Sequence, residues 1–147
     1  MKIFIKNLFV SLLFISCQQK IVPSDIAKIN GYWEIEKVVF SEGKDKDYTI
    51  NESYDFFQID SKNNGFRKKV MPQLDGTFIV NDTYESLKVR FADDKVFLDY
   101  VTPYAKWSEE LILVSKDKMV FKNAEKAEYN YKKAGAINIM SDDKKVK

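Results

Sequence analysis

The sequence contains no histidine and a single cysteine, and both scarcities limit the chemistry that the protein can carry out. Without histidine the chain cannot build a Ser-His-Asp or Cys-His nucleophile system, a His-ligated zinc site or an imidazole proton shuttle. A single cysteine excludes an intramolecular disulfide, a thiolate metal cage and an iron–sulfur cluster. We therefore expect no catalytic residue, no metal site and no cofactor.

Glycine, proline and net charge are also low, with five glycines, three prolines and a net charge of +2. Residues 1–16 carry two lysines and no acid, so the rest of the chain has as many basic as acidic residues, 22 of each. A neutral surface lacks the footprint of a nucleic-acid-binding protein, and we expect no nucleic-acid partner. With 147 residues, 45% of them hydrophobic, the chain can form one domain with a core.

The first 17 residues have the pattern of an export signal. Two lysines give a basic start, and residues 8–15 form an apolar run that only Ser11 interrupts. The run is about half of the roughly 20 residues that a membrane-spanning helix needs, so it favours a removable signal. The ending LFISC (13–17) resembles the lipobox of bacterial lipoproteins, in which the cysteine, here Cys17, is acylated, for example with palmitate. The lipobox prefers leucine where Phe14 stands, and the alternative is a secreted protein with an unpaired cysteine.

The chain divides into four parts by composition. We expect a signal peptide at 1–16, a tether at 17–23, a barrel domain at 24–133 and a polar tail at 134–147. Ser24 and Asp25 can cap a short helical turn that ends at Gly31. After it, segments rich in Val, Ile, Phe and Tyr alternate with turn residues, as in an antiparallel all-β protein. The predicted strands are 32–40, 54–60, 65–71, 77–81, 84–91, 95–101, 108–114, 118–123 and 127–132.

The links between these strands are short enough to fix the topology. Turns of two to four residues, such as 62–65 and 92–94, force neighbouring strands to pair antiparallel, which gives a meander. A meander of eight or nine strands has two open edges and one apolar face, and closing it removes both edges and buries that face. We therefore predict an up-and-down β-barrel. A sandwich would need long return loops, and only 41–53 is long.

The first predicted strand carries a family resemblance. Gly31-Tyr32-Trp33 follows the helical turn directly, and this Gly-x-Trp is similar to the first signature of the lipocalin superfamily. With the lipobox, the meander and the final Tyr129-x-Tyr131 strand, the chain resembles the lipocalin-like lipoproteins of Bacteroidota. The resemblance implies that Trp33 plugs the closed end of the barrel and that Gly31 allows close backbone approach.

The resemblance also implies a function and a location. It suggests a lipoprotein attached to a membrane of the bacterial cell envelope, namely the outer membrane. The barrel would bind a small hydrophobic or amphiphilic ligand, and the ligand-binding residues are unknown from the sequence. Residues 18–20 lack an acidic export signal, which favours the periplasmic face. Lipocalins place an arginine over the tryptophan; this chain has arginine only at 67 and 90, so Lys122 or Lys132 is expected to substitute.

Acidic residues offer weak candidates for catalysis. The pairs are Glu109–Glu110, Asp93–Asp94 and Glu34–Glu36. Glu109 and Glu110 are adjacent on a strand and face opposite sides, Asp93–Asp94 is a turn, and Glu34 and Glu36 lie on the outer face. We therefore expect a protein that is not an enzyme. Two charged residues, Asp55 and Lys37, fall on the inner face and would line the mouth, pair together or hold a ligand head group.

A second function stays open at this point. A barrel filled with side chains would have no ligand cavity, and its loops could then bind an envelope protein, as an inhibitor or immunity factor does. The best candidate loops are 41–53 and 102–107, the second of which contains Tyr104 and Trp107.

Overall fold

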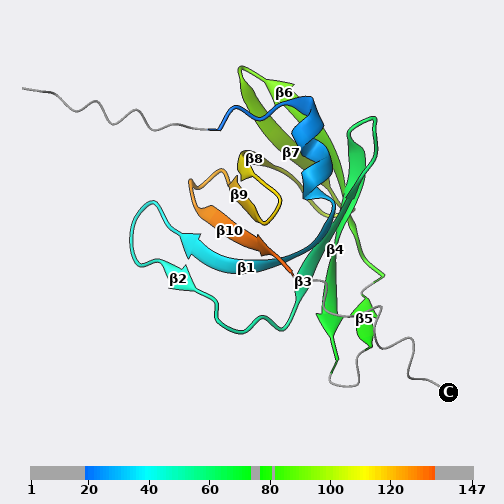
Figure 1. Ribbon diagram of the computed structural model, residues 1–147, viewed down its shortest axis with the longest axis vertical. Helices are drawn as coiled ribbons and strands as arrows, with labels where there is room; N and C mark the ends of the chain where they lie inside the picture. Colours follow the sequence, from blue (N-terminus) through cyan, green and yellow to red (C-terminus); the bar gives the residue numbers. More distant parts are fainter. Residues whose placement is uncertain (1–18, 74–76, 81, 135–147) are drawn as a thin grey trace, which may run out of the picture.

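The computed structural model of the protein describes residues 19–73, 77–80 and 82–134. In these residues a short 3-10 helix, η1 (Pro23–Ile29), precedes ten strands (Figure 1). The strands are β1 (Gly31–Val39), β2 (Lys46–Asp47), β3 (Tyr54–Ile59), β4 (Asn64–Pro72), β5 (Phe78–Val80), β6 (Glu85–Ala92), β7 (Lys95–Val101), β8 (Lys106–Val114), β9 (Lys118–Lys122) and β10 (Glu128–Lys133).

Eight strands form a closed antiparallel barrel in the order β10-β9-β8-β7-β6-β4-β3-β1, and pairing of β1 with β10 closes the ring. β5 pairs with β4 outside this ring, and β2 adds to β1. Closure leaves the ring without free edges, since every strand pairs on both sides. The predicted fold class, an up-and-down barrel preceded by a short helical turn, is confirmed.

Each of the nine predicted strands is present, with boundaries that differ by at most two residues. The predicted strand 77–81 corresponds to β5 and is not part of the ring. β2 could not be predicted from the sequence, because its two residues, Lys46 and Asp47, are charged and too few to show alternation. The predicted turn at 92–94 joins β6 to β7 with positive φ at Asp93 (51°) and Asp94 (60°), as a two-residue hairpin turn requires.

The two ends of the barrel differ. The strands β1, β4, β7 and β9 all begin at one end of the barrel, and η1 covers this end (Figure 1). We call it the closed end and the opposite one the open end. Ile26 and Ile29 of η1 belong to the hydrophobic core. The side chain of Asn30 fixes η1 to β3, since its amide donates to the Ile59 carbonyl (3.1 Å) and its oxygen accepts from the Ile59 amide (2.7 Å).

Trp33 fills the centre of the closed end and is 0% exposed. Its indole N–H donates to the Ile29 carbonyl at 2.6 Å, which satisfies the polar atom of a large buried side chain. The Lys133 ammonium lies 4.4 Å from the ring centroid and donates to the carbonyl oxygens of Asn30 and Lys28. Burial lowers the pKa of Lys133.

The cation over the tryptophan is thus Lys133, and the prediction of Lys122 or Lys132 was wrong. Lys132 faces outward and pairs with Glu34 at 2.8 Å, because adjacent residues of a strand point to opposite faces. Gly31 stands beside Lys133 with φ +115°, and a Cβ there would lie 3.1 Å from the Lys133 ammonium nitrogen. Both the backbone conformation and the space at this position favour glycine.

A β-bulge in β1 corrects another expectation. The pairing of β1 with β10 shifts between Ile35 and Lys37, so the alternation of inner and outer side chains reverses at this point. Val38 is buried opposite Tyr129, and Lys37 points outward, where it pairs with Asp45 at 2.8 Å. Lys37 therefore does not lie on the inner face.

Candidate functional site at the open end of the barrel

A pocket of about 580 Å³ lies inside the open half of the barrel. Its walls include Trp33, Asp55, Arg67, Glu109, Tyr129 and Tyr131. The segment between β2 and β3, which contains Tyr48 and Ile50, forms one side of its mouth. The volume is within the range typical of small-molecule sites, roughly 300–1,000 Å³.

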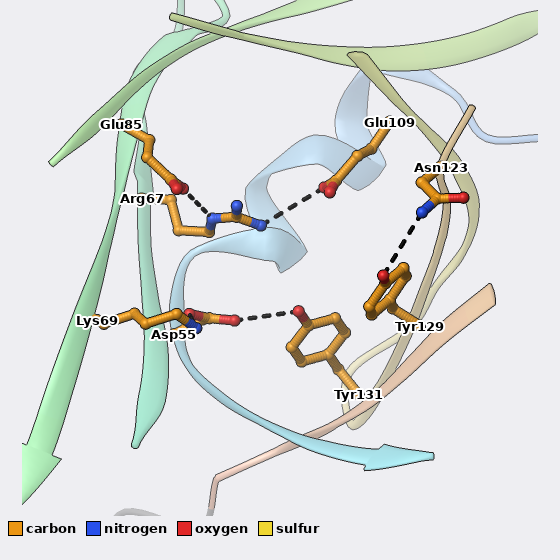
Figure 2. Close-up of polar contacts among 8 residues, drawn as sticks. All are labelled: Asp55, Arg67, Lys69, Glu85, Glu109, Asn123, Tyr129 and Tyr131. Atoms are coloured by element: carbon orange, nitrogen blue, oxygen red, sulfur yellow. Dashed lines mark hydrogen bonds and ion pairs between the residues drawn. The ribbon is translucent and has the colours of Figure 1, made fainter. Parts of the chain in front are cut away.

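Arg67 is the central charged residue of this half. It comes from β4, its side chain is 11% exposed, and its guanidinium donates hydrogen bonds to Glu85 of β6 and to Glu109 of β8 (Figure 2). The guanidinium also lies 4.5 Å from the centroid of the Tyr100 ring. Burial acts to lower the pKa of Arg67, but Tyr100 and the carboxylates outweigh it and raise the pKa above its ordinary value. Arg67 is therefore a permanent buried cation.

Asp55 of β3 is a second buried charge, 5% exposed. It accepts hydrogen bonds from the Tyr131 hydroxyl (3.1 Å) and from the Lys69 ammonium (2.9 Å), as Figure 2 shows. Lys69 lies at the mouth, where 64% of its side chain is exposed. Burial raises the pKa of Tyr131 well above its ordinary value, and the Asp55 charge adds to the effect, so Tyr131 stays a neutral donor.

The polar atoms of Glu109 and Tyr100 have poorer hydrogen-bond and ion-pair partners than those of their neighbours. Burial raises the pKa of Glu109, and the Arg67 cation opposes this shift. The contact between Glu109 and Arg67 is long, at 3.5 Å. The Tyr100 hydroxyl is buried close to Glu109, yet no hydrogen bond of good geometry satisfies it among the described residues. Such buried unsatisfied groups are uncommon in proteins, and each one calls for an explanation.

Part of this cluster was predicted from the sequence. Asp55 is on the inner face as predicted, and Glu109 faces inward while Glu110 points outward to Lys95 at 3.2 Å. Arg67 and Glu85 were missed as site residues. Glu85 carried a signal, since it alternates in register with the inward Leu87 and Val89. Arg67 carried none, because its neighbours two positions away are Gly65 and Lys69. Only the barrel closure brings β4, β6 and β8 within hydrogen-bonding distance.

A second pocket of about 870 Å³ adjoins the first at Arg67 and Lys69 and extends to the loops before β6 and after β7. Tyr84 and Tyr104 line it, and Tyr104 is 97% exposed. Most of the exposed large hydrophobic side chains that the structure describes lie at this end of the barrel. They are Phe40, Ile50, Met71, Ile79, Val80, Tyr84, Val101 and Tyr104. Trp107 is half-buried and stacks on Tyr100 at a centroid distance of 5.1 Å.

Comparison with solved structures finds weak similarity in fold. A lipocalin-like protein from Bacteroides uniformis has 11% sequence identity and a TM-score of 0.47, with 73% of this chain and 99% of that chain covered. An uncharacterized protein from Bacteroides eggerthii has 12% identity and a TM-score of 0.47, over 71% of this chain and 98% of that chain. No family model and no curated protein matches the sequence.

The described residues contain no group of three or more acidic or cysteine side chains placed to hold a metal ion. Within the same residues, no helix has the length and hydropathy needed to cross a bilayer. Cys17, the predicted lipidation site, lies outside the described part of the chain, as do the signal peptide and nearly all of the predicted tail.

Proposed function

We propose that the protein is a binding protein, not an enzyme, and that the open half of its barrel holds a small amphiphilic molecule. The observation that carries this proposal is the pocket of about 580 Å³, which has buried charged groups on one side and aromatic groups on the other. β1 and β10 contribute Trp33 and Tyr129, and β4 and β8 contribute Arg67 and Glu109. A ligand with one polar and one apolar part matches both sides.

The charged cluster argues against a barrel that serves only as a scaffold. Taking charges out of water costs several kcal/mol per ion, about what a good ion pair returns, so such a cluster adds little stability. Aliphatic side chains at Arg67, Glu85 and Glu109 would fill the same volume without this cost. Their presence beside a pocket supports a role in ligand recognition.

Titration with a neutral apolar fluorophore, N-phenyl-1-naphthylamine, tests the proposal. We expect saturable binding with one site per chain. Ile35→Trp places a large ring in the pocket and should abolish binding. Val39→Trp is the matched control, because it adds the same ring to the outer face of the same strand. Absence of saturable binding, or binding that survives Ile35→Trp, would refute a ligand site in the barrel.

We further propose that Cys17 is acylated and anchors the protein in a bacterial envelope membrane, at the periplasmic face of the outer membrane. The side-chain amide of Gln19 is fixed to the closed end by two 3.0 Å hydrogen bonds with the Val114 backbone. Two residues span at most about 7 Å, so an acylated Cys17 would hold the closed end at the membrane and direct the open end away from it. Cys17→Ala should release the protein from the membrane fraction; retention would exclude the anchor.

One observation favours a protein partner as the alternative function. The exposed apolar side chains at the open end include Ile50 (85% exposed) and Tyr104 (97% exposed), which lie in the predicted recognition loops. A partner that binds there would raise the melting temperature of the protein in an envelope extract. The shift should disappear in the double variant Ile50→Ser/Tyr104→Ser and after protease treatment of the extract.

A further inference from the structure

The interior of the open half has more acidic than basic groups. Asp55, Glu85 and Glu109 face Arg67 and Lys69. Lys69 neutralises Asp55 from the mouth, and its own ammonium is mostly hydrated there. Arg67 must therefore serve two carboxylates with one charge, and the buried cluster has an excess of one negative charge when every group is ionised.

The excess negative charge is located at Glu109. Glu85 receives the close hydrogen bond from the Arg67 Nε, whereas Glu109 is held only at 3.5 Å from Nη1. The Glu109 side chain is 14% exposed, and Glu109 lines the pocket. Beside it lies the hydroxyl of the buried Tyr100, whose interaction with the carboxylate acts to lower the pKa of Glu109. The Glu109 carboxylate thus has no close cationic partner next to the pocket.

Aromatic rings complete the surroundings of this carboxylate. Tyr131 and Tyr129 of β10 line the same pocket, and Figure 2 shows both rings and Glu109 directed into the barrel interior. The faces of aromatic rings attract cations, and the attraction is stronger where water is displaced. A carboxylate and aromatic rings around one pocket are the groups that bind an organic cation.

We infer that the ligand of this pocket carries an organic ammonium group, which pairs with Glu109 against the aromatic side of the barrel. This inference rests on the proposed function and specifies the ligand class. The ammonium group supplies the missing positive charge, so binding leaves the cluster neutral. An anionic head group would instead add a second excess negative charge beside Glu109.

Protons and the ammonium group compete for the same carboxylate. Glu109 faces Asp55 of β3, Arg67 of β4, Glu85 of β6, Tyr100 of β7 and Tyr131 of β10. Burial raises its pKa above the ordinary 4.5. Affinity for an ammonium ligand should therefore fall as the pH is lowered through the pKa of Glu109 and be restored at higher pH.

Calorimetric titration with octylammonium, octanol and octanoate at pH 8 and pH 5 tests the inference. We expect octylammonium to bind about tenfold more tightly than octanol, and octanoate most weakly, at pH 8. The preference should shrink at pH 5, where octylammonium itself stays protonated. Glu109→Gln should abolish the preference and its pH dependence. Glu110→Gln, which removes the adjacent carboxylate on the outer face, should leave both unchanged.

The outcomes separate the inference from the proposed function. Equal binding of the three compounds, or tightest binding of octanoate, overturns the ammonium ligand but keeps an amphiphile site. Failure of all three and of the neutral fluorophore overturns both. If Glu109→Gln does not fold, the dependence of octylammonium affinity on pH in the unsubstituted protein decides the question, because octanol provides the uncharged reference.

Discussion

The closed and open halves of the barrel are built from the same strands but have opposite interiors. In the closed half the inward side chains are apolar, and Ile29, Trp33, Phe57, Leu98 and Met119 are all 0% exposed. In the open half the inward positions of β3, β4, β6 and β8 hold charges, namely Asp55, Arg67, Glu85 and Glu109. The change occurs within two residues on β3, from Phe57 to Asp55, and on β8, from Leu111 to Glu109.

The difference separates the half that stabilises the fold from the half that holds the proposed ligand site. Each fully buried large apolar side chain contributes about 1.5–3 kcal/mol, so the closed half supplies most of the folding free energy. The ion pairs of the open half contribute little net stability, because desolvation offsets their attraction. Substitutions in the two halves should accordingly differ in how much they change the free energy of unfolding, in the pH dependence of that change and in their effect on ligand binding.

Trp33→Ala should have the largest effect on stability. It removes the largest buried side chain of the closed half and its hydrogen bond to Ile29, and we expect a loss of about 4 kcal/mol. Chemical denaturation measures the change. Trp107→Ala, at a half-buried position of the open half, should cost clearly less; an equal loss would show that the two halves contribute alike.

Arg67→Met should destabilise the protein by about 3 kcal/mol at pH 7, because it leaves the buried carboxylate of Glu109 and the partly buried carboxylate of Glu85 without a cation. The loss should shrink at acid pH, where protonation of Glu109 removes its unpaired charge. The triple variant Arg67→Met/Glu85→Gln/Glu109→Gln should recover most of the stability. If the triple variant is as unstable as Arg67→Met alone, packing rather than charge explains the loss.

Lys133→Met should cost about 1–2 kcal/mol, since it removes the ammonium that lies over Trp33 and donates to the backbone carbonyl oxygen of Asn30. Its neighbour Lys132 pairs with Glu34 on the outer face, and Lys132→Met should change stability by less than about 0.5 kcal/mol. Thermal unfolding of both variants makes the comparison. A larger effect at 132 would contradict the assignment of Lys133 as the closing cation.

Glu109→Gln should have the smallest effect and alter mainly the pH dependence. A carboxyl group with a raised pKa in the folded state binds more protons there than in the unfolded chain, so it favours folding at low pH. Its contribution is lost as the pH rises from about 4.5 through the folded pKa. The difference in unfolding free energy between the protein and Glu109→Gln should therefore change across this window and be constant above it. Glu110→Gln should show no such change.

Local sequence patterns predicted the strands and their antiparallel order. Alternation at Leu87, Val89 and Phe91 defined β6, and the Asp93-Asp94 turn defined the hairpin to β7, because both signals act between neighbouring residues. The bulge in β1 could not be predicted, since it depends on how β10 pairs with β1 from the far end of the chain. That one residue decided that Val38, and not Lys37, faces inward.

The sequence by itself determined the barrel class, the absence of histidine and disulfide chemistry, and the inward position of Asp55, since composition and a two-residue period are local properties. Only the tertiary structure decided that Lys133 covers Trp33 and that Arg67, Glu85 and Glu109 meet around one pocket. These residues lie on different strands, and the distances between them are set by ring closure and register, which no single segment encodes.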